Sequence, residues 1–247
     1  MSDYGRKKHA VLHFLEFSLT ENINFGVFES VLWQSKSENI NKGFEFAYMN
    51  PIIFYRPVEF SMQSSKGNAL MGANFNMTFG KATLYGQILL DDLNISRQKD
   101  RDEDYDEGFF QNKYAYQLGL KRVVKNIKLL LEYNQVQPYT YGHRTILQNY
   151  SHMNQALAHP LGANFKEVVF VVDFKKSNWR YRLKITNALV GLDSLNTHYG
   201  QNIFASDNSM RNWYGNFNGQ GVSTQINTLY TEVAYSFKLF DVFGSVF

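Results

Sequence analysis

The chain consists of paired segments in which apolar and polar side chains alternate, and the connections along it are short and long in turn. In NWRYRLKITNAL, residues 178–189, Trp, Tyr, Leu and Ile alternate with two arginines, a lysine and a threonine. A period of two places successive side chains on opposite faces of a β-strand. The pattern therefore predicts strands with one apolar face and one polar face.

Ten such segments form five predicted hairpins whose internal connections have only a few residues. The paired segments are 10–19 and 23–33, 69–79 and 82–92, 113–122 and 127–135, 166–174 and 178–189, and 225–238 and 240–247. The connections from one hairpin to the next are much longer, at residues 34–68, 92–112, 137–164 and 190–224. Soluble β-sandwiches show no such alternation of connection lengths. Transmembrane β-barrels have it, with tight turns at one end and long loops at the other.

Strand length and charge agree with this prediction. Each segment has close to the roughly 9–11 residues with which a tilted strand crosses the hydrocarbon layer. The sequence thus predicts an all-β fold, an antiparallel transmembrane β-barrel in which residues 1–247 form one domain. Charged residues of the polar face suit a wet barrel interior; they are Arg56, Glu59, Glu132, Glu167, Arg180, Arg182 and Lys184. The alternative is a soluble sandwich with its polar face turned outward.

The two ends of the chain and its composition narrow the classes of protein further. The start, MSDYGRKKHAVLHFLEFSL, enters alternating sequence without a signal peptide, so we expect the N-terminal portion of the barrel to be missing. Cysteine is absent, which excludes disulfides and thiolate metal sites. A net charge of +3, from lysines, arginines and acids spread along the chain, gives no argument for a nucleic-acid partner.

Several stretches are similar to a known family. NPIIFYRPVEFSMQSSKGNALMGANF, LYGQILLDDL, LEYNQVQPYTYGH and QNYSHMNQALAHPLGANFKE resemble the Wzi-type capsule-assembly family, and most of all its Bacteroidetes members of the RemB gliding-motility kind. The likeness covers most of residues 45–190. It implies a Gram-negative outer-membrane barrel, larger than ten strands in better-known members. It also implies a role in surface polysaccharide attachment or assembly, or in motility. No catalytic residues carry over from it.

The loop 137–164 is the strongest candidate for a binding surface. It combines flat aromatic rings with amide and imidazole groups, which suits sugars because their rings have an apolar face and a hydroxyl edge. The candidate glycan-binding residues are Tyr139, Tyr141, His143, Asn149, Tyr150, His152, Asn154 and His159. The alternative is that these groups only form the internal hydrogen bonds of an ordered loop. The histidine spacings of nine and seven residues, without a nearby carboxylate, fit no metal site.

The sequence therefore predicts a non-enzymatic outer-membrane barrel without a cofactor. Its expected partners are surface polysaccharide, outer-membrane lipid and proteins of a surface machinery. Two other functions stay open: a channel or transporter, and a structural subunit of a larger surface assembly.

Overall fold

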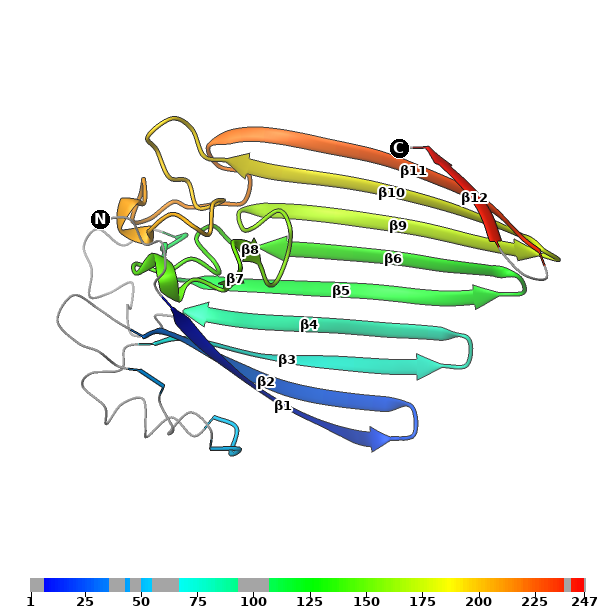
Figure 1. The fold of residues 1–247 in the computed structure, drawn as a ribbon, viewed down its shortest axis with the longest axis horizontal. Helices are drawn as coiled ribbons and strands as arrows, with labels where there is room; N and C mark the ends of the chain where they lie inside the picture. The colour runs from blue at the N-terminus through cyan, green and yellow to red at the C-terminus, as the bar shows by residue number, and fades with distance from the viewer. Residues whose placement is uncertain are drawn as a thin grey trace.

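The protein is all-β, and its strands form one antiparallel sheet with a small separate hairpin (Figure 1). The computed structural model of the chain describes residues 7–35, 43–44, 50–54, 67–92, 107–237 and 241–246. In sheet order, the ten strands are β1 (Lys8–Thr20), β2 (Ile23–Gln34), β3 (Asn68–Phe79), β4 (Ala82–Asp92), β5 (Lys113–Val124), β6 (Ile127–Val136), β9 (Phe165–Lys176), β10 (Trp179–Leu192), β11 (Val222–Ser236) and β12 (Asp241–Val246).

All five predicted hairpins are confirmed. The ten strands of the sheet lie side by side in the order in which they occur along the chain. The four turns between β1 and β10 have two residues each. Gly80, Lys125 and Ser177 open three of these turns with positive φ angles of 58°, 51° and 52°. The turns gather at one end of the strands and the long loops at the other (Figure 1). The alternation of short and long connections in the sequence thus places all the short turns at one end of the sheet and all the long loops at the other.

The two faces of the sheet differ sharply in chemistry, because residues opposite each other in antiparallel strands lie on the same face. One row crosses eight strands and is apolar throughout: Ile23, Met77, Leu84, Leu120, Leu131, Phe170, Ile185 and Leu229. We call the side that carries this row the apolar face. Leu131, Ile185 and Leu229 are each more than 40% exposed on it.

The opposite side, which we call the polar face, carries the charges. Arg182 pairs with both Asp173 and Glu232, and Glu132 pairs with Val169, which in turn pairs with Thr186. The register confirms that five of the charged residues assigned from sequence to a common face do share it: Glu132, Glu167, Arg180, Arg182 and Lys184. Arg56 and Glu59, which the sequence places with them, lie outside the described residues.

The sheet is open in the part of the chain that the structure describes. β1 and β12 are its two edges, and neither pairs with the other. Closure into a barrel, which the sequence predicts, is therefore not seen among these strands. No helix among the described residues is long and apolar enough to cross a membrane.

The largest buried cluster lies at the loop end of the sheet, on the polar face. There the strands present apolar residues in place of charged ones, among them Leu32, Leu70 and Phe165, which are at most 1% exposed. Tyr141, Ala163 and Ile203 come from the long loops and pack against them. The loops therefore fold inward over the polar face and bury its loop end.

Candidate functional site

Loop 137–164 is ordered and lies against the sheet rather than extending away from it. It contains a short 3-10 helix, η2 (Ile146–Gln148), and a hairpin of β7 (Ser151–His152) and β8 (Gln155–Ala156), which the sequence did not predict. The backbone N–H of Tyr141 donates to Oδ2 of Asp91 at 2.6 Å. The side-chain amide of Asn149 donates to the carbonyl of Ile203 at 3.0 Å, which ties this loop to loop 193–221.

Beneath this loop, polar side chains form a row that crosses five strands of the polar face. The pairs Asn74–Gln87, Gln87–Gln117, Gln117–Asn134 and Asn134–Glu167 are directly opposite in the strand register. Four amides and one carboxylate thus stand side by side from β3 to β9. We call these five residues the amide row.

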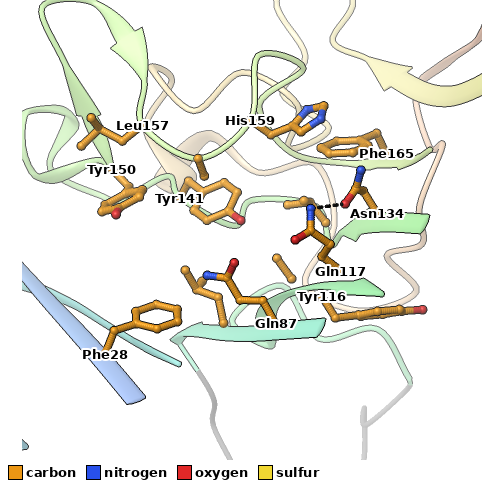
Figure 2. Close-up of a pocket in the computed structure, with 14 residues that line it drawn as sticks. Phe28, Gln87, Tyr116, Gln117, Asn134, Tyr141, Tyr150, Leu157, His159 and Phe165 are labelled. Carbon is orange, nitrogen blue, oxygen red and sulfur yellow. Dashed lines mark hydrogen bonds between the residues drawn. The ribbon is translucent and has the colours of Figure 1, made fainter. Parts of the chain in front are cut away.

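A cavity of about 260 Å³ separates the amide row from the loop (Figure 2). Gln87 and Gln117 extend into it from the sheet, and Tyr141, Tyr150 and His159 lie across from them (Figure 2). Other parts of the wall are apolar; they are formed by Phe28, Leu89, Ala115, Val136, Leu157 and Phe165. The site therefore opposes amides to aromatic rings.

Hydrogen bonds fix the orientation of one end of the amide row. Nε2 of Gln117 donates to Oδ1 of Asn134 at 3.0 Å, and Nδ2 of Asn134 donates to Glu132 and Glu167, each at 3.0 Å. The backbone N–H of Leu161 donates to Nδ1 of His159 at 3.2 Å. Nε2 of His159 therefore bears the hydrogen that it donates to Glu167, at 3.2 Å. This network leaves the Gln117 carbonyl directed toward the cavity, into which the Gln87 side chain also extends (Figure 2).

A close approach of two strands supports this network from below. Tyr85 lies across Gly119, where a Cβ atom would come within 2.1 Å of the Tyr85 ring. The hydroxyl of Tyr85 then reaches Glu132 and donates to it at 2.5 Å. Glycine is needed at position 119 because any side chain would displace this ring.

The eight candidate glycan-binding residues fall into three groups. Tyr141, Tyr150 and His159 line the cavity. Tyr139 and Asn149 are each 2% exposed and serve the interior, where the Tyr139 hydroxyl donates to the carbonyl of His198 at 3.1 Å.

The remaining candidates lie elsewhere on the loop. His152 and Asn154 are exposed at the β7–β8 hairpin, and His143 is partly buried beside Thr145, whose backbone N–H donates to its Nδ1. Neither His152, Asn154 nor His143 lines the cavity. The structure thus brings three of the eight together.

The tyrosines of the site are neutral hydrogen-bonding groups at physiological pH. Burial raises the pKa of Tyr141 and of Tyr150 above the ordinary value for tyrosine. Burial also raises the pKa of Tyr139, to about 12. These hydroxyls can therefore donate and accept hydrogen bonds without carrying charge.

The donor set does not favour a metal ion. No three histidine, aspartate or glutamate side chains come together in a metal-binding group anywhere in the described ranges. Sequence comparison gives no independent assignment either: no protein-family model matches the chain, and no curated protein matches it. The chemistry of the cavity itself therefore carries the functional argument.

Acid should loosen loop 137–164 through His143. Burial lowers the pKa of His143 to about 4, and the positive charges of Lys113 and Arg144 act in the same direction against the opposing charge of Asp207. Between pH 6.5 and 4 the unfolded loop binds a proton that the folded loop does not, so stability present above pH 6.5 is lost as pH falls through this window.

Two measurements check this prediction. The His143 ring resonances should titrate near pH 4, and the pH dependence of loop stability should disappear in His143→Gln. A titration midpoint near 6.5 for the folded protein would contradict the buried, neutral state.

Proposed function

We propose that the protein is a non-enzymatic outer-membrane β-barrel of the Wzi type that binds surface polysaccharide in the cavity beneath loop 137–164. Its role is then the attachment or assembly of capsule or exopolysaccharide, or gliding motility. The observation that carries the proposal is the cavity in which Gln87 and Gln117 face Tyr141, Tyr150 and His159. The resemblance of the sequence to that family supports the cellular role.

The exposed apolar face supports location in a membrane. Water penalises a continuous apolar surface that spans eight strands, and soluble monomers rarely expose large apolar patches. Hydrocarbon does not penalise it, and it is what the outer surface of a membrane barrel requires. The charged polar face then lines an aqueous interior, with the long loops folding into one mouth.

The cavity chemistry supports a sugar as the ligand. A pyranose has C–H surfaces that pack on rings such as Tyr141 and Tyr150, and hydroxyls that pair with amides such as Gln87 and Gln117. Such binding sites combine apolar walls with a few oriented polar groups. Glu132 and Glu167 are each engaged by Asn134, which favours binding over acid–base chemistry.

A conducting channel is a second candidate, favoured by one observation. Polar and charged residues lie along the polar face from Gln117 past Glu132 to Lys128, interrupted by Leu130, which offers a solute a largely polar path. Steady ion conductance across planar bilayers would favour this function. Retention of polysaccharide without conductance would favour the first.

Removing the amides should weaken glycan binding. The double variant Gln87→Leu/Gln117→Leu keeps side-chain size but loses two sets of hydrogen bonds, so we expect affinity for polysaccharide from the producing cells to fall about 10- to 30-fold. Gln225→Leu is the matched control, because Gln225 is exposed and outside the cavity. Binding by titration calorimetry of the full chain in detergent measures both.

The exposed loop tip offers a second control. His152→Ala should leave affinity unchanged, since His152 does not line the cavity. Equal affinity in the wild type and the double variant would reject the cavity as the glycan site. An effect of His152→Ala alone would move the site to the loop tip.

A further inference from the structure

A second cavity opens on the polar face, toward the short turns. It has a volume of about 640 Å³. Its floor is apolar and consists of Leu130, Val169 and Val171. Four basic side chains of the polar face line it, together with two carboxylates: Lys121, Lys128, Arg182 and Lys184, with Glu132 and Asp173. The polar face therefore contributes an excess of positive charge to this cavity.

Ion pairing inside the cavity occupies one basic group, Arg182, and one of the two carboxylates, Asp173. Arg182 is satisfied by Asp173, with Nε at 2.8 Å from Oδ1 and Nη2 at 3.2 Å from Oδ2, and Arg180 also approaches Asp173 at 3.4 Å. The Asp173 carboxylate is thus shared by two arginines. The sequence pattern groups these arginines with Lys184, whereas in the structure only the two arginines pair with Asp173.

The three lysines are not paired in this way. Within 4.0 Å, neither Lys121, Lys128 nor Lys184 forms an ion pair with any carboxylate of the described residues. The ammonium group of Lys121 lies 4.5 Å from the centre of the Tyr85 ring, and Tyr85 in turn donates to Glu132. All three ammonium groups are therefore available to an anion that enters the cavity.

The two cavities are adjacent. Asn134 lines the first and Glu132 lines the second, and Nδ2 of Asn134 donates to Oε1 of Glu132 at 3.0 Å. The hydrogen-bonded side chains of Asn134 and Glu132 therefore lie between the two cavities. A chain-like ligand that occupies the first cavity can extend past this pair of side chains into the second cavity.

We propose that the second cavity binds the anionic groups, carboxylate or phosphate, of the polysaccharide held beneath loop 137–164. The inference rests on the proposed function and assigns the ligand to the acidic glycans. Lysine ammonium groups supply charge, and Leu130, Val169 and Val171 supply a surface for the C–H faces of sugar rings.

The spacing of the lysines favours a polymer over a single small anion. Lys121 and Lys184 occupy the same row of the sheet, with Leu130 and Val171 between them. Three strand intervals separate their backbones by about 14 Å. At this spacing, successive acidic residues along a chain can each contact one ammonium group without either lysine leaning toward the other.

The experiment uses one polysaccharide in three charge states. Surface polysaccharide from the producing cells is tested untreated, after chemical reduction of its carboxyl groups, and after removal of its phosphate groups. The full chain in detergent is compared with Lys121→Gln/Lys184→Gln. Lys166→Gln/Lys176→Gln is the control, because it removes the same charge at exposed positions outside both cavities.

We expect the untreated polysaccharide to bind the wild type about tenfold more tightly than one of the two treated forms, and which form binds weakly identifies the anionic group. The double lysine variant should lose this preference while retaining the weaker, charge-independent binding. The control should keep the preference, and added salt should reduce it in the wild type.

The failures are distinguishable. Equal affinity for all three forms overturns the anion site but leaves glycan binding intact, whereas no binding of any form overturns the proposed function as well. A charge preference that survives in Lys121→Gln/Lys184→Gln rejects this cavity as its source. Decanoate binding that is lost in Lys121→Gln/Lys184→Gln and is not displaced by the polysaccharide would show a fatty-acid site and overturn the proposal.

Discussion

Replacing Ile185 by arginine is expected to prevent stable membrane insertion of the proposed barrel. Ile185 is central in β10, is 42% exposed, and has Phe170 and Leu229 as its neighbours on the apolar face. If that face meets lipid, an arginine near the bilayer midplane costs about 2–4 kcal/mol. In a water-exposed sheet the same change stays within about 0.5 kcal/mol of neutral. A large loss of stability therefore indicates lipid contact at Ile185, and almost none indicates water.

The adjacent residue provides the control. Thr186 lies on the polar face between Val169 and Thr228, so Thr186→Arg should be accommodated in the aqueous interior of the proposed barrel. The measurements are recovery in the membrane fraction and urea unfolding from lipid vesicles. Equal behaviour of the two arginine variants would remove the basis for a barrel. Full recovery of the wild-type chain in solution without detergent would remove it independently.

Local pattern was sufficient to predict the strands and the hairpins. In β10 alternation is strict from Trp179 to Thr186 and the connection to β9 is short, so this strand specifies its own faces and its nearest partner. The strand ends were less accurate, because segment 225–238 is β11, Val222–Ser236. Whether the last residues of a strand are polar or apolar depends on the loops that cover them. Alternation of polar and apolar residues therefore does not locate the end of a strand.

The candidate site was predicted only in part, because it depends on pairing between distant segments. β6 pairs with β9 across the whole of loop 137–164, and only this register places Asn134 beside Glu167. The polar residues Gln87 and Gln117 were visible in the sequence, but their alignment into one row was not. Assigning a register to each hairpin and extending it from strand to strand across the sheet would have predicted that these residues lie in one row.

The loop residues illustrate the same limit. Tyr139 and Tyr141 are two positions apart in a segment without periodicity, yet one is held by His198 and the other faces the cavity. Their positive φ angles of 68° and 70° belong to an irregular backbone path that strand patterns do not describe. Composition identified the loop as a concentration of aromatic and amide groups, and packing determined which of them meet the cavity.

Anchoring of the loops connects the fold to the proposed binding. Lys113, at the start of β5, is 3% exposed and donates to Oδ2 of Asp207 at 2.6 Å and to the carbonyl of Gly142 at 3.2 Å. Asp207 begins the short helix η3 (Asp207–Ser209) in loop 193–221. One ammonium group therefore holds both inward-folded loops against the sheet, and the cavity exists only while they stay there.

Lys113→Met is expected to release these loops, so that trypsin can cleave after Arg144 and Arg211, whose side chains are already exposed but whose backbone is held in the folded loops. Removing one partner of a buried ion pair leaves the other charge uncompensated, at a cost of about 3–5 kcal/mol. Cleavage at these sites follows the population of the open loop, so its rate should rise about 100-fold or more, unless opening becomes complete first. Glycan affinity should fall in parallel, because the Tyr141 wall is lost with the loop.

The double variant Lys113→Met/Asp207→Leu separates the charge from the packing. With neither charge buried, most of the protection against trypsin should return, and the difference from the sum of the single variants measures the coupling between the two side chains. The strands should be unaffected throughout, which far-ultraviolet circular dichroism checks. If Lys113→Met left tryptic cleavage unchanged, this ion pair could not be what holds the loops over the cavity.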